Sequence, residues 1–517
     1  MSEPTPPSHE RSHHAEESIK ETLIAIIISF ALAFVARSYV AEPFIIPTGS
    51  MAPTLLGAHM RFHSPDTGYT WASNPRDYAD TSRDLPIDPQ GSTSAGRDPI
   101  IYTDPMSRTA WSRSDVPLRS GDRILVQKYL YALRPPRRWD VAVFKHPEEP
   151  ETNLIKRVVG LPGERLALID GDIFTRANNS GSWTIQRKPP RVQRAVWQTI
   201  FDSQFTPMPD PGEPPFVSPW LSPGWDTTSR IYRWADDSTA TLTWNTSEHP
   251  LDDRVAYNAT AGFSSSSPFP VSDLRIRFSI KPETPPDSIT IAISARSHDF
   301  EAYIAGSTAT LRMRPISGRR NHDSWITLGA ATISPITTSR HTPIELAHHD
   351  QTLTLRIDND VVASAPYDWS ASERLAHALA PTNPSAPRVD NPRDYITPTI
   401  SITIASTPLE ITRISVARDL HYQSQRIGSS LSRASSLDNA VSLDTNHFFM
   451  LGDNSPASRD ARAFDHVDPW VANAVGDTLG VVHRDLIMGR AFLVYFPSPH
   501  TNHLIPIPDF SRMRLID

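Results

Sequence analysis

The sequence predicts a mainly β protein with one long N-terminal helix, and three observations lead to this fold class. Proline supplies 49 of the 517 residues and hydrophobic residues only 38%, a composition that favours strands, turns and ordered loops over helices. Only one segment, near the N-terminus, is strongly apolar. Beyond residue 120, short runs alternate apolar and polar residues, as strands do. The length allows two or three domains.

Charge and cysteine content exclude several classes of protein. The net charge is −7 with both signs mixed along the chain, so the basic stripe that nucleic-acid binding needs is missing, and we expect no nucleic-acid partner. The absence of cysteine excludes disulfides, thiol catalysis and cysteine-ligated metals. We expect no cofactor and no metal site.

The N-terminal region is predicted to be a tail followed by a membrane anchor. Residues 1–21 are polar and are expected to form a disordered cytoplasmic tail. Residues 22–36 form a 15-residue stretch without charge. We place a transmembrane anchor at 22–41, because spanning needs about 20 residues and Arg37 can snorkel to the interface. A cleavable signal peptide is the alternative. Lysine and arginine counts weakly favour an internal N-terminus.

The rest of the chain divides into one interrupted domain and two insertions. Residues 42–57 are predicted to form a strand running into a turn, and alternating apolar strands return after the first interruption. The expected boundaries are an interrupted β domain at 42–57, 118–175 and 440–497, which carries the candidate catalytic residues described below, insertions at 58–117 and 176–440, and a C-terminal tail at 498–517.

The second insertion is expected to contain an antiparallel β-sandwich at about 270–425. Several runs there keep strict period two, with turn residues between them. The alternating apolar positions are Leu274, Ile276, Phe278 and Ile280, then Ile289, Ile291 and Ile293, then Leu353, Leu355 and Ile357, then Ile400, Ile402 and Ile404. Residues 411–422 look like the last strand of a concanavalin-like or laminin-G-like jelly roll.

The candidate chemistry centres on Ser50 and Lys156. A serine hydroxyl is a poor nucleophile unless a base removes its proton. A histidine base is conceivable, but no Gly-x-Ser-x-Gly elbow surrounds Ser50. Lys156 lies among apolar neighbours on a predicted strand, where burial can lower its pKa from the usual ~10.4. An exposed lysine in a charged pair remains the alternative.

Five segments, in order along the chain, resemble the bacterial type I signal peptidases (leader peptidases). They are 43–55 (PFIIPTGSMAPTL), 121–128 (GDRILVQK), 139–164 (including WDVAVFK and IKRVVGLPGE), 452–462 (GDNSPASRDAR) and 486–491 (LIMGRA). They cover about a quarter of the chain. The implied fold is a signal-peptidase-type antiparallel β domain with one N-terminal transmembrane helix, here carrying the inserted β-sandwich.

This resemblance implies a serine–lysine dyad. Ser50 would be the nucleophile and Lys156 the general base, forming an acyl-enzyme that water releases. The Ser50 backbone N–H and the Thr48 hydroxyl, where many relatives have serine, would form the oxyanion hole, and Ser458 would orient the lysine. Structural support, as scaffold rather than catalysis, is expected from Asp453, Asp460 and Arg462.

The resemblance also implies how a substrate would bind. A peptide would add as a strand between the segment around Phe44 and the segment before Lys156. Pockets for small residues before the cleaved bond would be lined by Phe44, Ile46, Met51 and Ile155. Ordinary core side chains are the alternative for each.

The implied function is a membrane-bound serine endopeptidase that removes N-terminal signal peptides from exported preproteins after small residues. Its partners would be preproteins and the lipid bilayer, and a ligand of the inserted sandwich stays open. It would lie in the cytoplasmic (inner) membrane as a single-pass protein, with the catalytic domain on the outer face. The alternative is a membrane-tethered glycan- or cell-wall-binding protein on a peptidase scaffold. A self-cleaving regulator is disfavoured because no helix-turn-helix or basic region occurs.

One segment of the first insertion has the outline of a zinc-ribbon knuckle. Residues 62–69 (FHSPDTGY) follow the pattern Cys-Pro-x-Cys-Gly-Tyr, with Ser64 and Thr67 in the cysteine positions. Hydroxyls do not replace thiolates on zinc. A metal-free remnant and a plain loop both remain open.

Overall fold

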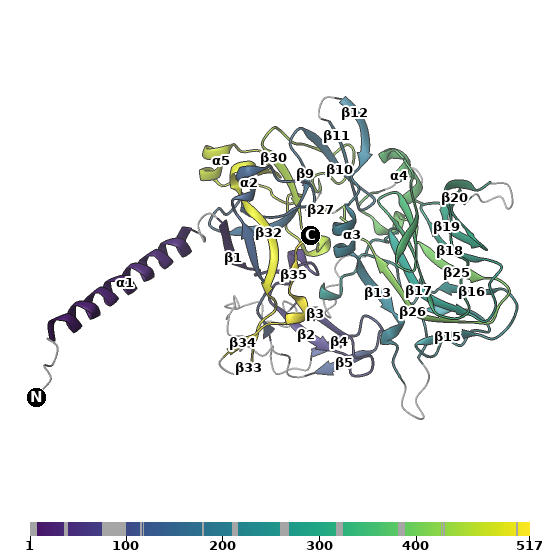
Figure 1. The fold of residues 1–517 in the computed structure, drawn as a ribbon. Helices are drawn as coiled ribbons and strands as arrows, with labels where there is room; N and C mark the ends of the chain where they lie inside the picture. Colours follow the sequence, from purple (N-terminus) through teal and green to yellow (C-terminus); the bar gives the residue numbers. More distant parts are fainter. Residues whose placement is uncertain are drawn as a thin grey trace, which may run out of the picture.

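The computed structural model is mainly β, as predicted (Figure 1). The residues it describes are 8–35, 40–74, 100–113, 116, 118–177, 180–208, 216–258, 268–316, 324–380, 388–424, 426–427, 430–502 and 505–517.

The N-terminal helix α1, Ser8–Val35, extends away from the body of the protein (Figure 1). It begins inside the segment expected to be a disordered tail, because Ala15, Glu16 and Glu17 favour helix. In the part of the chain that the structure describes, no helix combines the length and apolar character that crossing a bilayer requires. The predicted anchor at 22–41 is therefore not confirmed, and its residues 36–39 lie outside the described part.

The interrupted domain, which is expected to be catalytic and is called the catalytic region, is built on an eight-stranded sheet, ordered β1-β7-β32-β8-β9-β30-β31 with β35 paired to β32. The strands are β1 Ala41–Ile45, β7 Arg123–Gln127, β8 Val141–Lys145, β9 Asn153–Gly160, β30 His447–Leu451, β31 Val482–His483, β32 Ile487–Phe496 and β35 Arg514–Leu515. Three segments distant in sequence thus form one sheet. Because β35 pairs with β32 and Ile516 is buried, the end of the chain is part of this fold and not the tail expected at 498–517.

A smaller sheet links this region to the second insertion. Its order is β12-β11-β10-β29, with β10 Glu164–Ile169, β11 Asp172–Ala177, β12 Ser180–Ile185 and β29 Val441–Ser442. Helix α3, Pro190–Val196, follows β12 and buries Val192 and Val196.

The first insertion forms two hairpins. Strands β2 His59–His63 and β3 Thr70–Ser73 pair with each other, and β6 Leu118–Arg119 joins β2. Strands β4 Ile100–Thr103 and β5 Ala110–Arg113 form the second hairpin. The rings of Phe62 and Tyr102 stack between the hairpins, with centroids 4.5 Å apart.

The second insertion contains two seven-stranded antiparallel sheets. One has β13 Gln198–Asp202, β15 Ile231–Trp234, β17 Leu274–Pro282, β22 Thr342–His349, β23 Thr352–Ile357, β24 Asp360–Pro366 and β26 Leu409–Arg418. The other has β14 Trp220–Leu221, β16 Ala240–Trp244, β18 Ile289–Ala295, β19 His298–Ala305, β20 Thr308–Pro315, β21 Ile326–Thr332 and β25 Thr399–Ile404.

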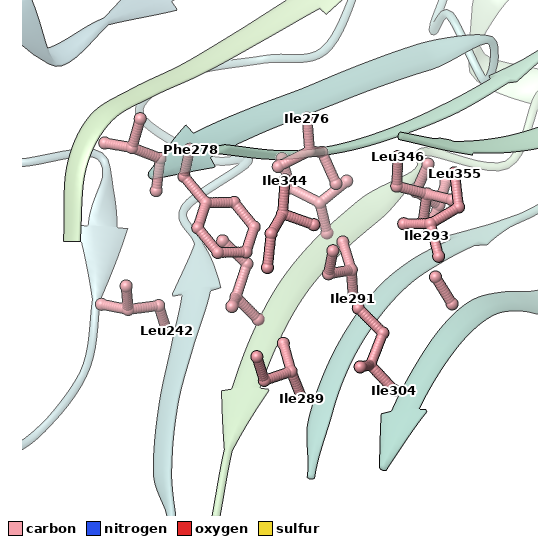
Figure 2. Packing of buried hydrophobic residues seen from close by; sticks show 14 of the residues in the cluster. Leu242, Ile276, Phe278, Ile289, Ile291, Ile293, Ile304, Ile344, Leu346 and Leu355 are labelled. Carbon is pink, nitrogen blue, oxygen red and sulfur yellow. The ribbon is translucent and has the colours of Figure 1, made fainter. Parts of the chain in front are cut away.

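Side chains from both sheets meet in one hydrophobic cluster (Figure 2). Ile276, Phe278 and Ile344 of the first sheet face Ile291 and Ile304 of the second. The sheets begin earlier than the residue 270 expected from the sequence, because β13 to β16 join them. These early strands have only two to five residues and lie among prolines, so each is too short for an apolar–polar alternation to be recognised in the sequence.

Buried ion pairs join the second insertion to the catalytic region. Arg374, on helix α4 Ala371–Ala378, contacts Asp170 at 2.8 Å and Asp172 at 2.5 Å. Arg296 contacts Asp170 at 2.6 Å. All four residues are buried, so the two regions share a charged interior rather than a solvated hinge.

Candidate active site

The turn that carries Ser50 is a single 3₁₀ turn, Gly49–Met51, just after β1. Met51 is fully buried and anchors the turn in the core. Asn454 holds it from the other side, because its backbone N–H donates to the Ser50 carbonyl at 3.0 Å and its side-chain Nδ2 donates to the Gly49 carbonyl at 2.9 Å. The Ser50 side chain is therefore presented by a backbone fixed on two sides.

The Lys156 amine meets the Ser50 hydroxyl although 106 residues separate them in the sequence. Lys156 Nζ lies 2.6 Å from Ser50 Oγ. The lysine is on β9 and is only 2% exposed. Burial lowers the pKa of Lys156 to about 8, against the opposing effect of Asp460 and Asp453. A neutral amine at this distance can take the proton of the hydroxyl.

Two buried ion pairs surround the lysine. Arg157, next to Lys156 on β9, binds Asp453 through Nε at 2.9 Å and Nη2 at 2.7 Å. Arg462 binds Asp460 through Nε and Nη2, both at 2.8 Å. Asp460 also accepts from the Gly452 N–H at 3.1 Å. Because each carboxylate is neutralised by an arginine, their pull on the lysine proton is limited.

Ser458 lies beside the site but does not make the contact expected of it. Its side chain is 7% exposed, and its Oγ has no hydrogen-bond partner among the described residues. The hydroxyl packs over Gly452, where a Cβ would lie 2.2 Å from it and 2.4 Å from the Ser50 carbonyl oxygen. Ser458 is thus a neighbour of the dyad, without the predicted hydrogen bond to Lys156 in this structure.

The oxyanion candidate Thr48 precedes the turn. It is exposed and extended, with φ −121° and ψ 160°, and its hydroxyl does not cap the turn. It therefore lies at the surface, two residues before Ser50 in the chain.

The four residues expected to line substrate pockets belong to one hydrophobic cluster. Met51 and Ile46 are fully or almost fully buried, and Ile155 is 8% exposed. Phe44 is half-buried at the edge of the cluster. Met51 and Ile46 therefore act as core side chains here, whereas Phe44 reaches the surface.

Two strand edges near the dyad are open. Among the residues that the structure describes, β1 is the first strand of its sheet and pairs with β7 alone. Within the described strands, residues 153–156 of β9 pair with β8 alone, since β30 begins to pair with β9 only at Arg157. The backbone on either side of the dyad can therefore accept a further strand.

Two residues near the Ser50 turn were not predicted from the sequence: Tyr257 packs against Gly49, and Asn258 hydrogen-bonds to Asn454. Both lie in the second insertion, in the 3₁₀ turn Ala256–Asn258. No local motif marks them, because their role depends on contacts almost 200 residues away in sequence.

The knuckle-like segment of the first insertion has a structural twin. The turn Ser64–Tyr69 closes with Ser64 N–H to Tyr69 O at 2.9 Å and Gly68 N–H to Ser64 O at 3.0 Å. The turn Asp104–Thr109 repeats both bonds, at 3.0 and 2.9 Å. Thr67 Oγ1 joins the turns by donating to Asp104 Oδ2 at 2.7 Å. A side-chain hydrogen bond therefore joins the two turns, whereas metal–sulfur bonds join the knuckles of a zinc ribbon.

A cluster of His349, Asp350 and Asp419 has the spacing of metal ligands. Lys188 Nζ already lies 2.5 Å from Asp350 and 2.9 Å from Asp419. The lysine ammonium supplies the positive charge there.

Comparison with known proteins identifies similar sequences in one family. The profile described as "Signal peptidase, peptidase S26" matches residues 101–192 and 398–496; this range contains Lys156 but not Ser50. Signal peptidase I of Rickettsia typhi is 26% identical over 158 residues, covering 31% of this chain and 44% of the relative. Signal peptidase I of Pseudomonas aeruginosa is 48% identical over 59 residues, covering 9% and 21%. The chain spans less than half the length of these relatives.

Solved structures similar in shape match parts of the chain only weakly. A carbohydrate-binding module from Bacillus subtilis has 8% identity and a TM-score of 0.22, covering 38% of this chain and 95% of that one. A galectin from Caenorhabditis elegans has 8% identity and a TM-score of 0.17, covering 29% and 84%.

Proposed function

We propose that this chain, which resembles the bacterial type I signal peptidases, is a membrane-associated serine endopeptidase that cleaves signal peptides from exported preproteins through a Ser50–Lys156 dyad. The observation that carries the proposal is the 2.6 Å contact between Ser50 Oγ and a buried Lys156 Nζ. The similarity to signal peptidases supports the same chemistry.

The reaction would begin with transfer of the Ser50 proton to neutral Lys156. The Ser50 oxygen attacks the carbonyl carbon of the scissile peptide bond, and the Ser50 N–H and Thr48 hydroxyl stabilise the oxyanion. Protonated Lys156 then gives its proton to the leaving amine, and the C–N bond breaks to leave an acyl-enzyme. Lys156 next takes a proton from water, whose oxygen attacks the acyl carbonyl carbon. As the C–O bond to Ser50 breaks, Lys156 returns this proton to the Ser50 oxygen, and the signal peptide leaves with a free carboxyl group.

Substrate binding would use the two open strand edges. An extended peptide between β1 and residues 153–156 would gain main-chain hydrogen bonds. Phe44 and the neighbouring cluster would face the side chains before the cleaved bond. Because the cluster is packed to the surface, only small side chains would fit there.

Membrane association is proposed through α1. The large apolar side chains described on this helix are exposed, from Ile26 at 46% to Phe34 at 65%. Burial in lipid would remove this apolar surface from water. The N-terminus would lie on the cytoplasmic side and the catalytic region outside, where exported preproteins emerge.

The two sheets of the second insertion are proposed to form a β-sandwich, because their facing side chains share one core. A ligand for this insertion stays open. The alternative of a glycan-binding protein on an inactive scaffold has less support, because the residues of the dyad lie together.

The test is cleavage of a preprotein by full-length protein in lipid vesicles. Ser50→Ala and Lys156→Ala are expected to abolish cleavage while preserving the folded protein, measured by circular dichroism. Lys281→Ala, on the distant sheet of the insertion, is the control and should cleave normally. Cleavage by either dyad variant would refute the mechanism. Cleavage of a preprotein with bulky residues before the cut would refute the proposed specificity.

A further inference from the structure

Tyr257, from the second insertion, packs directly against the backbone of the catalytic turn. A Cβ built at Gly49 would lie only 2.1 Å from Tyr257 Cε1. The Tyr257 side chain is almost fully buried, and its hydroxyl donates to the Ala58 carbonyl at 2.9 Å. The ring therefore covers Gly49 from one side, and residue 49 has room only for glycine.

Asn258 reaches the same turn through a second asparagine. Its Nδ2 donates to Asn454 Oδ1 at 2.7 Å, and Asn454 Nδ2 donates to Asn258 Oδ1 at 2.9 Å. This reciprocal pairing fixes the orientation of both amides. The same Asn454 Nδ2 also donates to the Gly49 carbonyl, so Asn258 sets the direction from which that carbonyl is held.

The Gly49 carbonyl matters because it belongs to the same peptide unit as the Ser50 N–H. A peptide bond is planar, so fixing the carbonyl direction also fixes the direction of the N–H. In the proposed reaction this N–H is an oxyanion donor, and such a donor contributes most when it is already oriented. Contacts to Gly49 therefore act on the oxyanion hole.

Both insertions brace the segment that makes these contacts. At the end of β3, the Asn74 N–H donates to the Tyr257 carbonyl at 2.7 Å, and Ser73 Oγ lies 3.4 Å from the same oxygen. From the other side, Arg418 of β26 donates to the Asp253 carbonyl at 3.0 Å and the Arg254 carbonyl at 3.2 Å. The turn is thus held by the hairpins of one insertion and the sheet of the other.

We propose that the 3₁₀ turn Ala256–Asn258 is a clamp on the catalytic turn, and that Tyr257 and Asn258 are positioning residues of the peptidase reaction. The inference rests on the proposed function. It gives the insertion a role inside the active site, in which it orients the Ser50 N–H without touching substrate.

The experiment measures kcat and KM separately on a soluble signal-peptide substrate, with full-length protein in detergent. Asn258→Ala removes both side-chain bonds to Asn454, and kcat is expected to fall about tenfold, the effect of roughly one hydrogen bond, with KM unchanged. Asn258→Asp keeps an acceptor for Asn454 Nδ2 and should recover part of the loss. Tyr257→Phe keeps the ring on Gly49 and should stay closer to wild type than Tyr257→Ala.

Two controls separate positioning from general stability. Asn359→Ala, on the exposed face of the insertion where Asn359 contacts Arg277, should leave kcat unchanged. The pH midpoint of kcat/KM should be the same in every clamp variant, because Lys156 is untouched. If Asn258→Ala does not fold, Asn258→Asp still removes the bond donated to Asn454 Oδ1, and its kcat should fall below wild type by less than tenfold.

The clamp is refuted if Asn258→Ala and Asn258→Asp keep wild-type kcat, or if only KM changes. If wild type cleaves in a Ser50-dependent way and the clamp variants cleave normally, the clamp is refuted but the proposed function is not. Loss of the proposed function would look different, since wild type would then not cleave or Ser50→Ala would still do so.

Discussion

The pH dependence of cleavage tests the proposed dyad most directly, because only neutral Lys156 can accept the Ser50 proton. Burial lowers the pKa of this lysine from 10.5 to about 8. Below that value kcat/KM is expected to fall about tenfold per pH unit, and above it to level off. At pH 7 about a tenth of the molecules would hold a neutral lysine, roughly 250 times more than for an exposed lysine.

The assay is the initial rate of peptide cleavage between pH 6 and 10 at low substrate concentration, with a peptide that has no titratable group near the cut. A flat profile from pH 6 to 9, or a midpoint near 10.5, would refute the assignment of Lys156 as base. Lys156→Arg should be inactive at every pH, since a guanidinium stays charged.

A single substitution should shift the pH midpoint of kcat/KM in a direction that follows from the charges around Lys156. The charge of Asp460 raises the pKa of Lys156, and that of Arg462 lowers it. Asp460→Asn removes the first and leaves the second unneutralised, so the midpoint should shift to lower pH. Asp465→Asn removes an exposed acid of the same segment and should leave the midpoint in place. A shift of the Asp460→Asn midpoint to higher pH would contradict the electrostatic reasoning.

Two further predictions concern the oxyanion hole and the first insertion. Thr48→Val should lower kcat about 10²- to 10³-fold, the usual effect of losing one oxyanion donor, whereas Thr48→Ser should stay near wild type; equal rates for both variants would exclude a role for the hydroxyl. Ser64 and Thr67 are the first and fourth residues of one knuckle-like turn, and Asp104 and Ser107 are the first and fourth of the other. Replacing all four by cysteine should create a tetrahedral site that binds one Co²⁺ or Zn²⁺, visible by thiolate–Co²⁺ absorption. The cysteine-free wild type and a variant with cysteines at 64 and 67 alone are the controls, and failure of the fourfold variant to bind metal would contradict the ribbon geometry.

The sequence was most informative where function depends on local motifs or on period two. The motif around Ser50 and the apolar surroundings of Lys156 predicted two residues that the fold brings within 2.6 Å. Alternation at Leu274–Ile280 predicted β17 for the same reason, since one face of that strand is buried.

Tertiary contacts explain what the sequence could not predict. Tyr257 and Asn258 lie in a tryptophan- and proline-rich stretch without period, and their partners Gly49 and Asn454 are remote in the chain. Strand β35 has only two residues, which is too short for any sequence pattern to predict it. The second knuckle-like turn, Asp104–Thr109, was not predicted from the sequence either, because aspartate and serine do not resemble the metal ligands of a zinc ribbon.

The buried pairs of Arg296 and Arg374 with Asp170 and Asp172 bear on how this protein melts. Separating the second insertion from the catalytic sheet would strand buried charges, and breaking one such pair typically costs about 3 to 5 kcal/mol. Neither region can therefore loosen far ahead of the other. Although the second insertion interrupts the catalytic region in the sequence, we expect calorimetry to record a single heat-absorption peak. The two regions would then unfold as one cooperative unit.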